Sequence, residues 1–445
     1  MKRSRQRACG LSTFVLLLAN PLACGGSHSG GEGGSGDLGG AGNGGMAPGT
    51  LQNGGAGGSG NVSTIGNGGQ GGGTTPGIGG ATGTTVDTKL VAKSVSANTS
   101  AYGGFACAVL TGSTIQCWGS NDFGQLGNVS RKDRLPVTVS GISNAVGVSA
   151  GDGNTCTVLG DGTVRCWAGN AYGQLGNGTT TSSSYLSVMV LGINNAKAVS
   201  TGGKHSCAVL ADGTVQCWGW NEAGALGDGT DTHRSTPVTV SGIGDAVSVS
   251  ASWDFTCALL RTGGIQCWGN NSCGELGNAI AVPGSTGTPV MVPGISNAIS
   301  LTTGESVTCA VLSDGSVQCW GWNYNGLLGD GTGKNSSTPV TIPSINNAVS
   351  VSATGEHACA LLRDGRIQCW GRNSYGQLGD GTTADSSTPV TVSGVVNATT
   401  VAAGNHFSCA VLGDGSVQCW GINDSGQLGN GTAANSSTPV MVGGL

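Results

Sequence analysis

The sequence has few of the residues that build an ordinary hydrophobic core or an ordinary charged surface. Aromatic residues make up 4% of the 445 residues and charged residues 9%, well below the charged fraction of about 25% in typical globular domains. Lysine and arginine number 18 against 23 aspartates and glutamates, so the formal net charge is −5. Four of the basic residues lie in the first seven positions. A phosphate-backbone binder needs a concentrated basic surface, so nucleic acid is not an expected partner.

The sequence also lacks an apolar run long enough to span a bilayer as a helix. Its start combines basic residues 1–7 with a short apolar run over residues 11–19, which is typical of an export signal. Leu22-Ala23-Cys24-Gly25 resembles the lipobox of bacterial lipoproteins, although Pro21 stands where that motif usually has leucine. We therefore expect residues 1–23 to be a signal peptide and Cys24 to carry lipid. The protein would then be an outer-membrane or cell-surface lipoprotein, held to the membrane by its lipid anchor only; plain secretion is the alternative.

Residues 24–87 contain almost no large apolar side chain and consist mainly of glycine, serine, threonine, asparagine and alanine. Such a segment cannot bury enough surface to offset the entropy lost on ordering. It predicts a disordered tether of roughly sixty residues with a reach on the order of 40–50 Å.

From about residue 88 the chain repeats itself. The string Cys207-Ala-Val-Leu-Ala-Asp-Gly-Thr-Val-Gln-Cys217-Trp218-Gly219 recurs seven times at spacings of 49 to 52 residues. Asp212-Gly213 is a hairpin signal, and a three-residue turn with Gly213 in the left-handed conformation places Cys207 opposite Cys217. Alternating stretches such as Ala-Val-Ser-Val-Ser and the later Thr-Pro-Val add further strands. Four short strands per repeat, without a helical pattern, predict an all-β, seven-bladed β-propeller over residues 88–445.

Seventeen cysteines are unusual in so weakly charged a chain, and fourteen of them form pairs at identical spacing. Regular pairs in an exported chain predict one disulfide within each blade. Zinc is the alternative, but each blade supplies only two thiolates and no histidine at ligand spacing. Cys273 stands outside the pairs and is expected to be free or to pair with another chain. The seven pairs are Cys107 with Cys117, Cys156 with Cys166, Cys207 with Cys217, Cys257 with Cys267, Cys309 with Cys319, Cys359 with Cys369 and Cys409 with Cys419.

The motif Asp-Gly-x-Val-x-Cys-Trp-Gly-x-Asn-x-x-Gly-Gln-Leu-Gly resembles the regulator-of-chromosome-condensation repeat. The resemblance covers residues from about 90 to 445 and implies a seven-bladed propeller closed by a composite blade. The start of the first copy, residues 90–97, would then pair with the end of the last, residues 438–442. The founding member exchanges nucleotide on a nuclear GTPase and docks on chromatin, which does not suit an exported chain without a basic tail. Secreted bacterial propellers of this repeat include a protein inhibitor of β-lactamase, so a face of the disc can bind protein.

Catalysis would require convergent acids, bases or nucleophiles. His205 and His357 occupy a position that is phenylalanine or valine in other copies, which indicates packing. The Gly-Asp-Gly-Thr loops at Asp228, Asp330 and Asp380 suggest calcium, but asparagine replaces the acid elsewhere and one carboxylate is poor coordination. We therefore expect no enzyme activity, no catalytic residue, no metal and no cofactor.

Positions that vary among the copies are free to carry function. They lie two and five residues after the blade tryptophan and include the types enriched at binding hot spots. We expect them to line one face of the disc as a recognition surface; the alternative is that the rings merely pack between neighbouring blades. The residues concerned are Trp220, Trp322, Arg372, Tyr172, Tyr375 and Phe123.

The sequence thus favours a monomeric, non-enzymatic binding or scaffold propeller on the bacterial cell envelope, with an unidentified protein or glycan as ligand. One alternative is a secreted propeller enzyme, a polysaccharide lyase or hydrolase, and another is a purely structural surface protein.

Overall fold

The computed structural model describes residues 90–98, 103–129, 132–181, 184–280 and 284–445. The signal peptide, the lipidation site Cys24 and the tether lie outside the described residues, so these three expectations remain predictions. Within the described residues the regular structure consists of 28 strands and one short 3-10 turn, η1 (Tyr324–Gly326). No helix in this part of the chain is long and apolar enough to cross a membrane.

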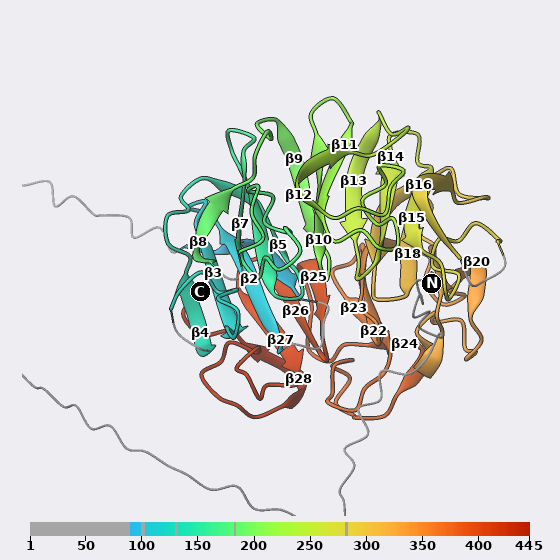
Figure 1. Cartoon of the computed structure of the whole chain (residues 1–445). Coiled ribbons are helices and arrows are strands. Elements are labelled where there is room, and N and C mark those ends of the chain that lie inside the picture. Colours follow the sequence, from blue (N-terminus) through green and yellow to red (C-terminus); the bar gives the residue numbers. More distant parts are fainter. Residues whose placement is uncertain (1–89, 99–102, 130–131, 182–183, 281–283) are drawn as a thin grey trace, which may run out of the picture. The chain divides into compact units, whose positions relative to one another are not determined.

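The strands form seven four-stranded antiparallel sheets, each built from four strands that follow one another in the chain (Figure 1). We number these blades 1 to 7 in chain order. The first strand of each blade contacts the first strands of both neighbouring blades, so these strands line the centre of a closed ring. They are β1 (Ala92–Ala97), β5 (Ala145–Ala150), β9 (Ala196–Thr201), β13 (Ala246–Ala251), β17 (Ala298–Thr303), β21 (Ala348–Ala353) and β25 (Ala398–Gly404).

The other three strands lie progressively further from the centre. The second strands are β2 (Phe105–Leu110), β6 (Asn154–Leu159), β10 (His205–Leu210), β14 (Phe255–Leu260), β18 (Val307–Leu312), β22 (His357–Leu362) and β26 (Phe407–Leu412). The third strands are β3 (Ile115–Ser120), β7 (Val164–Ala168), β11 (Val215–Gly219), β15 (Ile265–Asn270), β19 (Val317–Gly321), β23 (Ile367–Gly371) and β27 (Val417–Gly421). The outer strands are β4 (Lys132–Thr138), β8 (Ser184–Met189), β12 (Arg234–Thr239), β16 (Ser285–Met291), β20 (Ser336–Thr341), β24 (Ser386–Thr391) and β28 (Ser436–Met441).

The turn between the second and third strands sets the register of each blade. In blade 3, Gly213 has a φ of +86°, and the Leu210 amide donates to the Thr214 carbonyl. This turn places Cys207 directly opposite Cys217, as the sequence predicts.

All seven predicted disulfides form, each between directly opposed residues of the second and third strands of one blade. The fourteen cysteines are fully buried. Seven disulfides in one chain are typical of an oxidising compartment and indicate an extracellular environment. The bonds join Cys107 with Cys117, Cys156 with Cys166, Cys207 with Cys217, Cys257 with Cys267, Cys309 with Cys319, Cys359 with Cys369 and Cys409 with Cys419.

The ring does not close through a composite blade, so that expectation is wrong. Strand β1 pairs only with β2, and β28 pairs only with β27. The strands from β1 to β28 already form seven complete four-stranded sheets, so neither end of the chain has to supply a strand to an incomplete blade. Blades 1 and 7 instead meet face to face: the Ala92 amide donates to the Gly415 carbonyl, as the Ala246 amide donates to Gly213 between blades 3 and 4.

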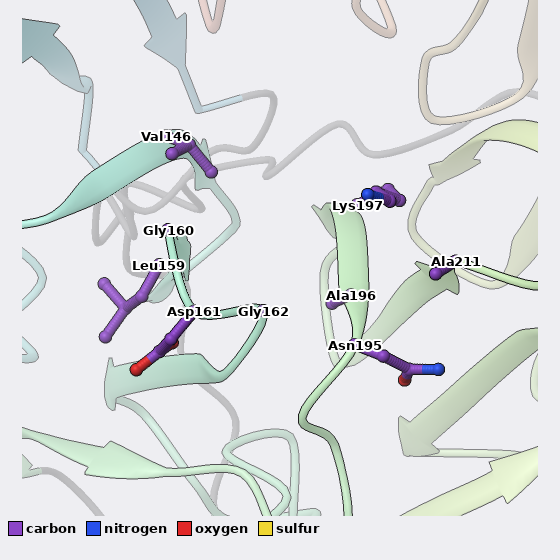
Figure 2. A pocket seen from close by; sticks show the side chains of 9 residues that line it. All are labelled: Val146, Leu159, Gly160, Asp161, Gly162, Asn195, Ala196, Lys197 and Ala211. Atoms are coloured by element: carbon purple, nitrogen blue, oxygen red, sulfur yellow. The ribbon is translucent and has the colours of Figure 1, made fainter.

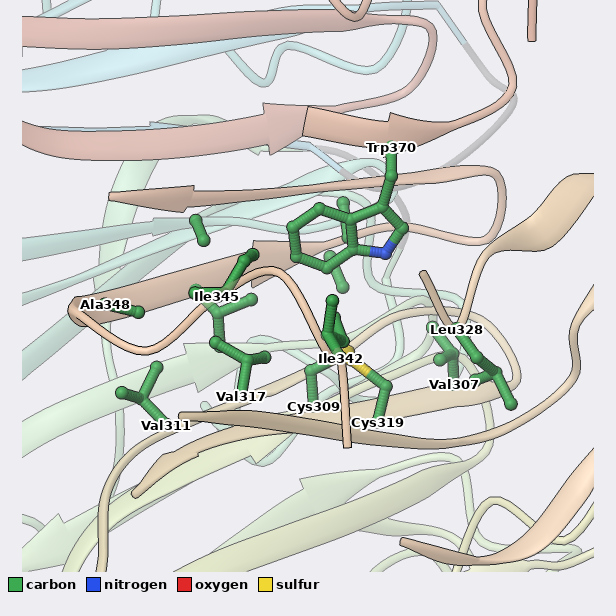
Figure 3. Packing of buried hydrophobic residues seen from close by; sticks show 14 of the residues in the cluster. Val307, Cys309, Val311, Val317, Cys319, Leu328, Ile342, Ile345, Ala348 and Trp370 are labelled. Carbon is green, nitrogen blue, oxygen red and sulfur yellow. A yellow bond between two sulfur atoms is a disulfide. The ribbon is translucent and has the colours of Figure 1, made fainter. Parts of the chain in front are cut away.

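The core is divided into seven clusters, one between each pair of neighbouring blades. Each cluster is covered by the tryptophan that ends the repeat motif, and all seven of these tryptophans are fully buried. Figure 3 shows Trp370 of blade 6 packed over Ile342 and the disulfide between Cys309 and Cys319 of blade 5. Its indole N–H donates to the Leu327 carbonyl at 2.8 Å. The remaining six tryptophans make the equivalent bond to the preceding blade, and Trp118 makes it to Gln427 across the ring closure.

These contacts predict that the closing junction is as strong as an interior one. Trp118→Phe and Trp370→Phe should each lower the free energy of unfolding by about 1–3 kcal/mol, because each removes the indole N–H that donates to a buried loop carbonyl. Guanidinium unfolding of the two variants measures this. If Trp118→Phe cost far less than its interior control Trp370→Phe, blades 1 and 7 would not form the junction described.

Candidate binding face

Two sets of loops lie at the same end of every blade. Since the second and third strands are antiparallel, the connection before the second strand and the connection after the third emerge together. In blade 2 these are residues 151–153 and the segment that begins at residue 169, and the Gly169 amide donates to the Gly153 carbonyl at 2.8 Å. We call the surface formed by both sets the loop face.

A repeated asparagine fixes the longer loop in each blade. In blade 3 the Asn221 side chain accepts from the Leu226 amide at 2.8 Å and donates to the Thr230 carbonyl at 3.1 Å. The equivalent asparagine is buried in all seven blades. The backbone of the loop is therefore nearly the same from blade to blade, and differences lie in the side chains that it presents. The seven asparagines are Asn121, Asn170, Asn221, Asn271, Asn323, Asn373 and Asn423.

The six predicted recognition residues all lie on the loop face, and none is fully buried. Phe123 is 40% exposed, and the other five are half-buried. Trp322 also packs against the core cluster between blades 5 and 6, so the packing alternative applies to it in part. Its ring stacks on Tyr324 with centroids 5.4 Å apart.

Tyr172 and Trp220 belong to a larger group that we call the aromatic cluster: Tyr172, Trp220, Trp253, His233 and Lys204. The Nζ atom of Lys204 lies 5.1, 5.8 and 5.3 Å from the ring centroids of Tyr172, Trp220 and Trp253. The His233 ring contacts Tyr172 edge-on at 5.7 Å and lies 6.2 Å from Trp220. Residues from blades 2, 3 and 4 thus meet around one ammonium group.

Arg372 and Tyr375 belong to a second group, the charged cluster, with Glu356 and His406. Arg372 pairs with Glu356 at 2.7 Å, and His406 Nδ1 lies 2.6 Å from the second oxygen of the same carboxylate. The Tyr375 and His406 ring centroids are 5.0 Å apart. Burial raises the pKa of Glu356, but His406 and Arg372 outweigh burial and hold the pKa below its ordinary value. The loop face therefore presents a carboxylate that stays ionised at neutral pH.

The sequence interpretation missed Lys204, Trp253, Glu356 and His406. All four lie in the short connections between first and second strands, whereas the prediction compared only positions after the blade tryptophan. These connections also differ among the copies: they read Gly-Asp-Gly in blade 2 and Ser-Trp-Asp in blade 4, so their variation is the sequence signal for these four residues.

The two histidines that the sequence places at packing positions have structural roles. His205 and His357 are buried and bond the hydroxyls of Thr256 and Ser408 in the next blade, each at 2.8 Å. Burial lowers the pKa of His205 to about 4 and that of His357 to about 3, so both are neutral at physiological pH.

The acids of the Gly-Asp-Gly-Thr loops also have structural roles, because each accepts the backbone amide two residues later as a turn residue. They are Asp228, Asp330 and Asp380. Within the described ranges no group of three or more histidine, cysteine, aspartate or glutamate side chains is placed to hold a metal ion.

Blade 4 departs from the others in one loop. Glu275 stands where four blades have glutamine, and like those glutamines it accepts the amide two residues earlier, that of Cys273, at 2.7 Å. Burial raises the pKa of Glu275 to about 8. Cys273 is disulfide-bonded, so the expectation of a free thiol there is wrong.

Glu275→Gln should stabilise the protein at neutral and alkaline pH. The folded-state pKa of about 8 lies above the ordinary 4.5, so the folded state retains a proton that the unfolded chain loses, and stability falls as pH rises between these values. Glutamine keeps the acceptor without the charge. Calorimetry should show a larger gain in Tm at pH 8 than at pH 5, with the exposed Glu222→Gln as control. Equal gains at both pH values would contradict the shifted pKa.

Comparison with solved structures supports the fold. Yeast RCC1 (Prp20), in its crystal structure bound to Kap60, superposes with a TM-score of 0.66 at 21% identity, over 74% of this chain and 83% of that chain. Human WBSCR16 gives a TM-score of 0.62 at 22% identity, over 72% and 85%. At these identities the similarity shows the fold alone. No curated protein matches the sequence.

Two family models, both described as "Regulator of chromosome condensation (RCC1) repeat", match the chain. One matches residues 116–158, 212–259, 314–361, 364–411 and 414–445. The other matches residues 196–225, 246–275, 298–327, 348–377 and 398–427. The two sets overlap in different registers along the propeller, and propellers of this repeat are typically binding or scaffold domains. The chain belongs to the family of proteins built from regulator of chromosome condensation (RCC1) repeats.

Proposed function

We propose that this protein is a non-enzymatic binding module, displayed on the bacterial cell envelope, that recognises a protein or a glycan through its loop face. The observation that carries the proposal is that each loop combines residues that are the same in all seven blades and hold its backbone with projecting side chains that differ from blade to blade. Asn221 is repeated in all seven blades and holds the loop, whereas the neighbouring Trp220 is serine, glycine, asparagine, arginine or isoleucine in five of the others.

The chemistry of the loop face supports this proposal. Tryptophan, tyrosine and arginine are the side chains that most often carry binding energy in interfaces, and here they are half-buried on one face. Half-buried rings held by neighbours are pre-organised, so they lose little conformational freedom when a partner binds. The core tryptophans, by contrast, have no exposed surface with which to bind anything.

Display outside the cytoplasm is supported by the disulfides together with the signal-like start of the sequence. A lipid on Cys24 and the glycine-rich segment after it would hold the propeller at a membrane surface while leaving its loop face accessible. The carboxylate that an enzyme of this face would use, that of Glu356, is already paired with Arg372 and His406.

The test is binding of the mature protein to a glycan array and to envelope extract, with two matched variants. Trp220→Ala plus Arg372→Ala should reduce capture of a ligand at least tenfold, the effect of about 1.4 kcal/mol. The control is Lys197→Ala, in a groove of about 380 Å³ between blades 2 and 3 at the opposite ends of the strands. Figure 2 shows Lys197 there, near Asn195. If both variants captured the ligand less well to the same extent, or if both captured it as well as the parent protein, recognition by the loop face would be contradicted.

A further inference from the structure

The ammonium of Lys204 lies among the rings of the aromatic cluster. Three rings from three consecutive blades lie within 6 Å of its Nζ, and the face of each ring attracts a cation. None of the ion pairs found among the described residues includes Lys204. The rings therefore hold a flexible side chain in place without a direct ion pair among the described residues.

The carboxyl group of Asp152 is electrostatically coupled to Lys204, but at neutral pH it is protonated and does not neutralise the ammonium. Asp152 is 6% exposed, and its Oδ1 atom has no hydrogen-bond partner in the described part of the chain. Burial, and after it the charge of Glu305, raise the pKa of Asp152 to about 8 against the opposing effect of Lys204. Below that pH the Asp152 carboxyl group keeps its proton.

The other titratable groups around the cluster make contacts of their own. The exposed His233 contacts Tyr172 and Trp220 through its ring. His205, next to Lys204 in the chain, is buried, and desolvation lowers its pKa to about 4. Asp254, next to Trp253, acts electrostatically on Glu275.

We propose that the aromatic cluster is a binding site for a saccharide that carries a carboxylate. The inference rests on the proposed function and names its ligand class. The carboxylate accepts hydrogen bonds from the Lys204 ammonium, and a charge-assisted bond of this kind is about twice as strong as a neutral one. The C–H groups of the sugar ring pack against the exposed parts of Tyr172, Trp220 and Trp253, whose ring faces carry partial negative charge.

The composition of the cluster favours an acidic saccharide over an acidic peptide. Peptides with several acidic or phosphorylated residues are recognised by clusters of arginine and lysine. Here one cation stands among three large rings, on a chain whose net charge is −5. Three rings and one cation fit a sugar residue that presents one apolar face and one carboxylate.

Isothermal titration calorimetry on the mature protein tests the site. The probes are a trisaccharide of galacturonic acid and a tetrasaccharide containing glucuronic acid, each compared with its methyl ester, which keeps the rings and removes the charge. The free acids should bind at least about tenfold more tightly than the esters. Lys204→Met, which keeps the length of the side chain, should abolish this preference, and Lys197→Met on the opposite side should leave it intact.

A second readout uses pH. Affinity for the free acids should fall severalfold as the pH rises through about 8, because ionised Asp152 then competes for Lys204. Asp152→Asn should remove this fall and leave the affinity at pH 7 unchanged, with thermal unfolding used to confirm that each variant is folded.

The proposal is overturned if neither acid binds, if the esters bind as tightly as the acids, or if folded Lys204→Met binds the acids as the parent does. A negative result for the acidic saccharides would not refute the proposed function. If an envelope protein or a neutral glycan were still captured in a manner that depends on Trp220 and Arg372, the loop face would remain a binding surface with a different ligand.

Discussion

The structure depends on one contact made seven times, between the indole of one blade and a loop carbonyl of the blade before it. Trp218 of blade 3 is fully buried, and its N–H donates to the Gln174 carbonyl at 2.9 Å. Gln174 lies in the loop that presents Tyr172 on the loop face. The contact that joins neighbouring blades therefore also fixes the backbone of the recognition loop, and fold and binding face share a single constraint.

This constraint explains which residues vary among the repeats. A Cβ atom at Gly176, where φ is +66°, would lie 2.8 Å from the indole nitrogen of Trp218, so this position accepts only glycine. Asn170 and Gln174 hold the same loop through the Leu175 and Tyr172 amides. Side chains that project from the loop meet no such requirement, and the chemical diversity of the protein is concentrated there.

The sequence was sufficient for the features that local chemistry decides. The Asp-Gly turn and the cysteine spacing predicted the strand pairing of Cys207 with Cys217, and the repeat count predicted seven blades. The ring closure was predicted wrongly because the repeat motif spans parts of two blades and its ends do not mark the ends of a sheet. The aromatic cluster was only half recognised, because Tyr172 and Trp253 are 81 residues apart in the sequence and meet around Lys204 only when three blades pack together.

We expect the loop-face ring of Trp220 to be dispensable for folding, unlike the fully buried blade tryptophans. The most direct measurement is chemical unfolding of Trp220→Ala beside Trp218→Ala, two neighbouring tryptophans in one blade. We expect the free energy of unfolding to fall by less than about 1 kcal/mol in Trp220→Ala and by about 3–5 kcal/mol in Trp218→Ala. If both variants lost a similarly large free energy of unfolding, Trp220 would be a packing residue. The loop face would then not be separate from the residues that stabilise the fold.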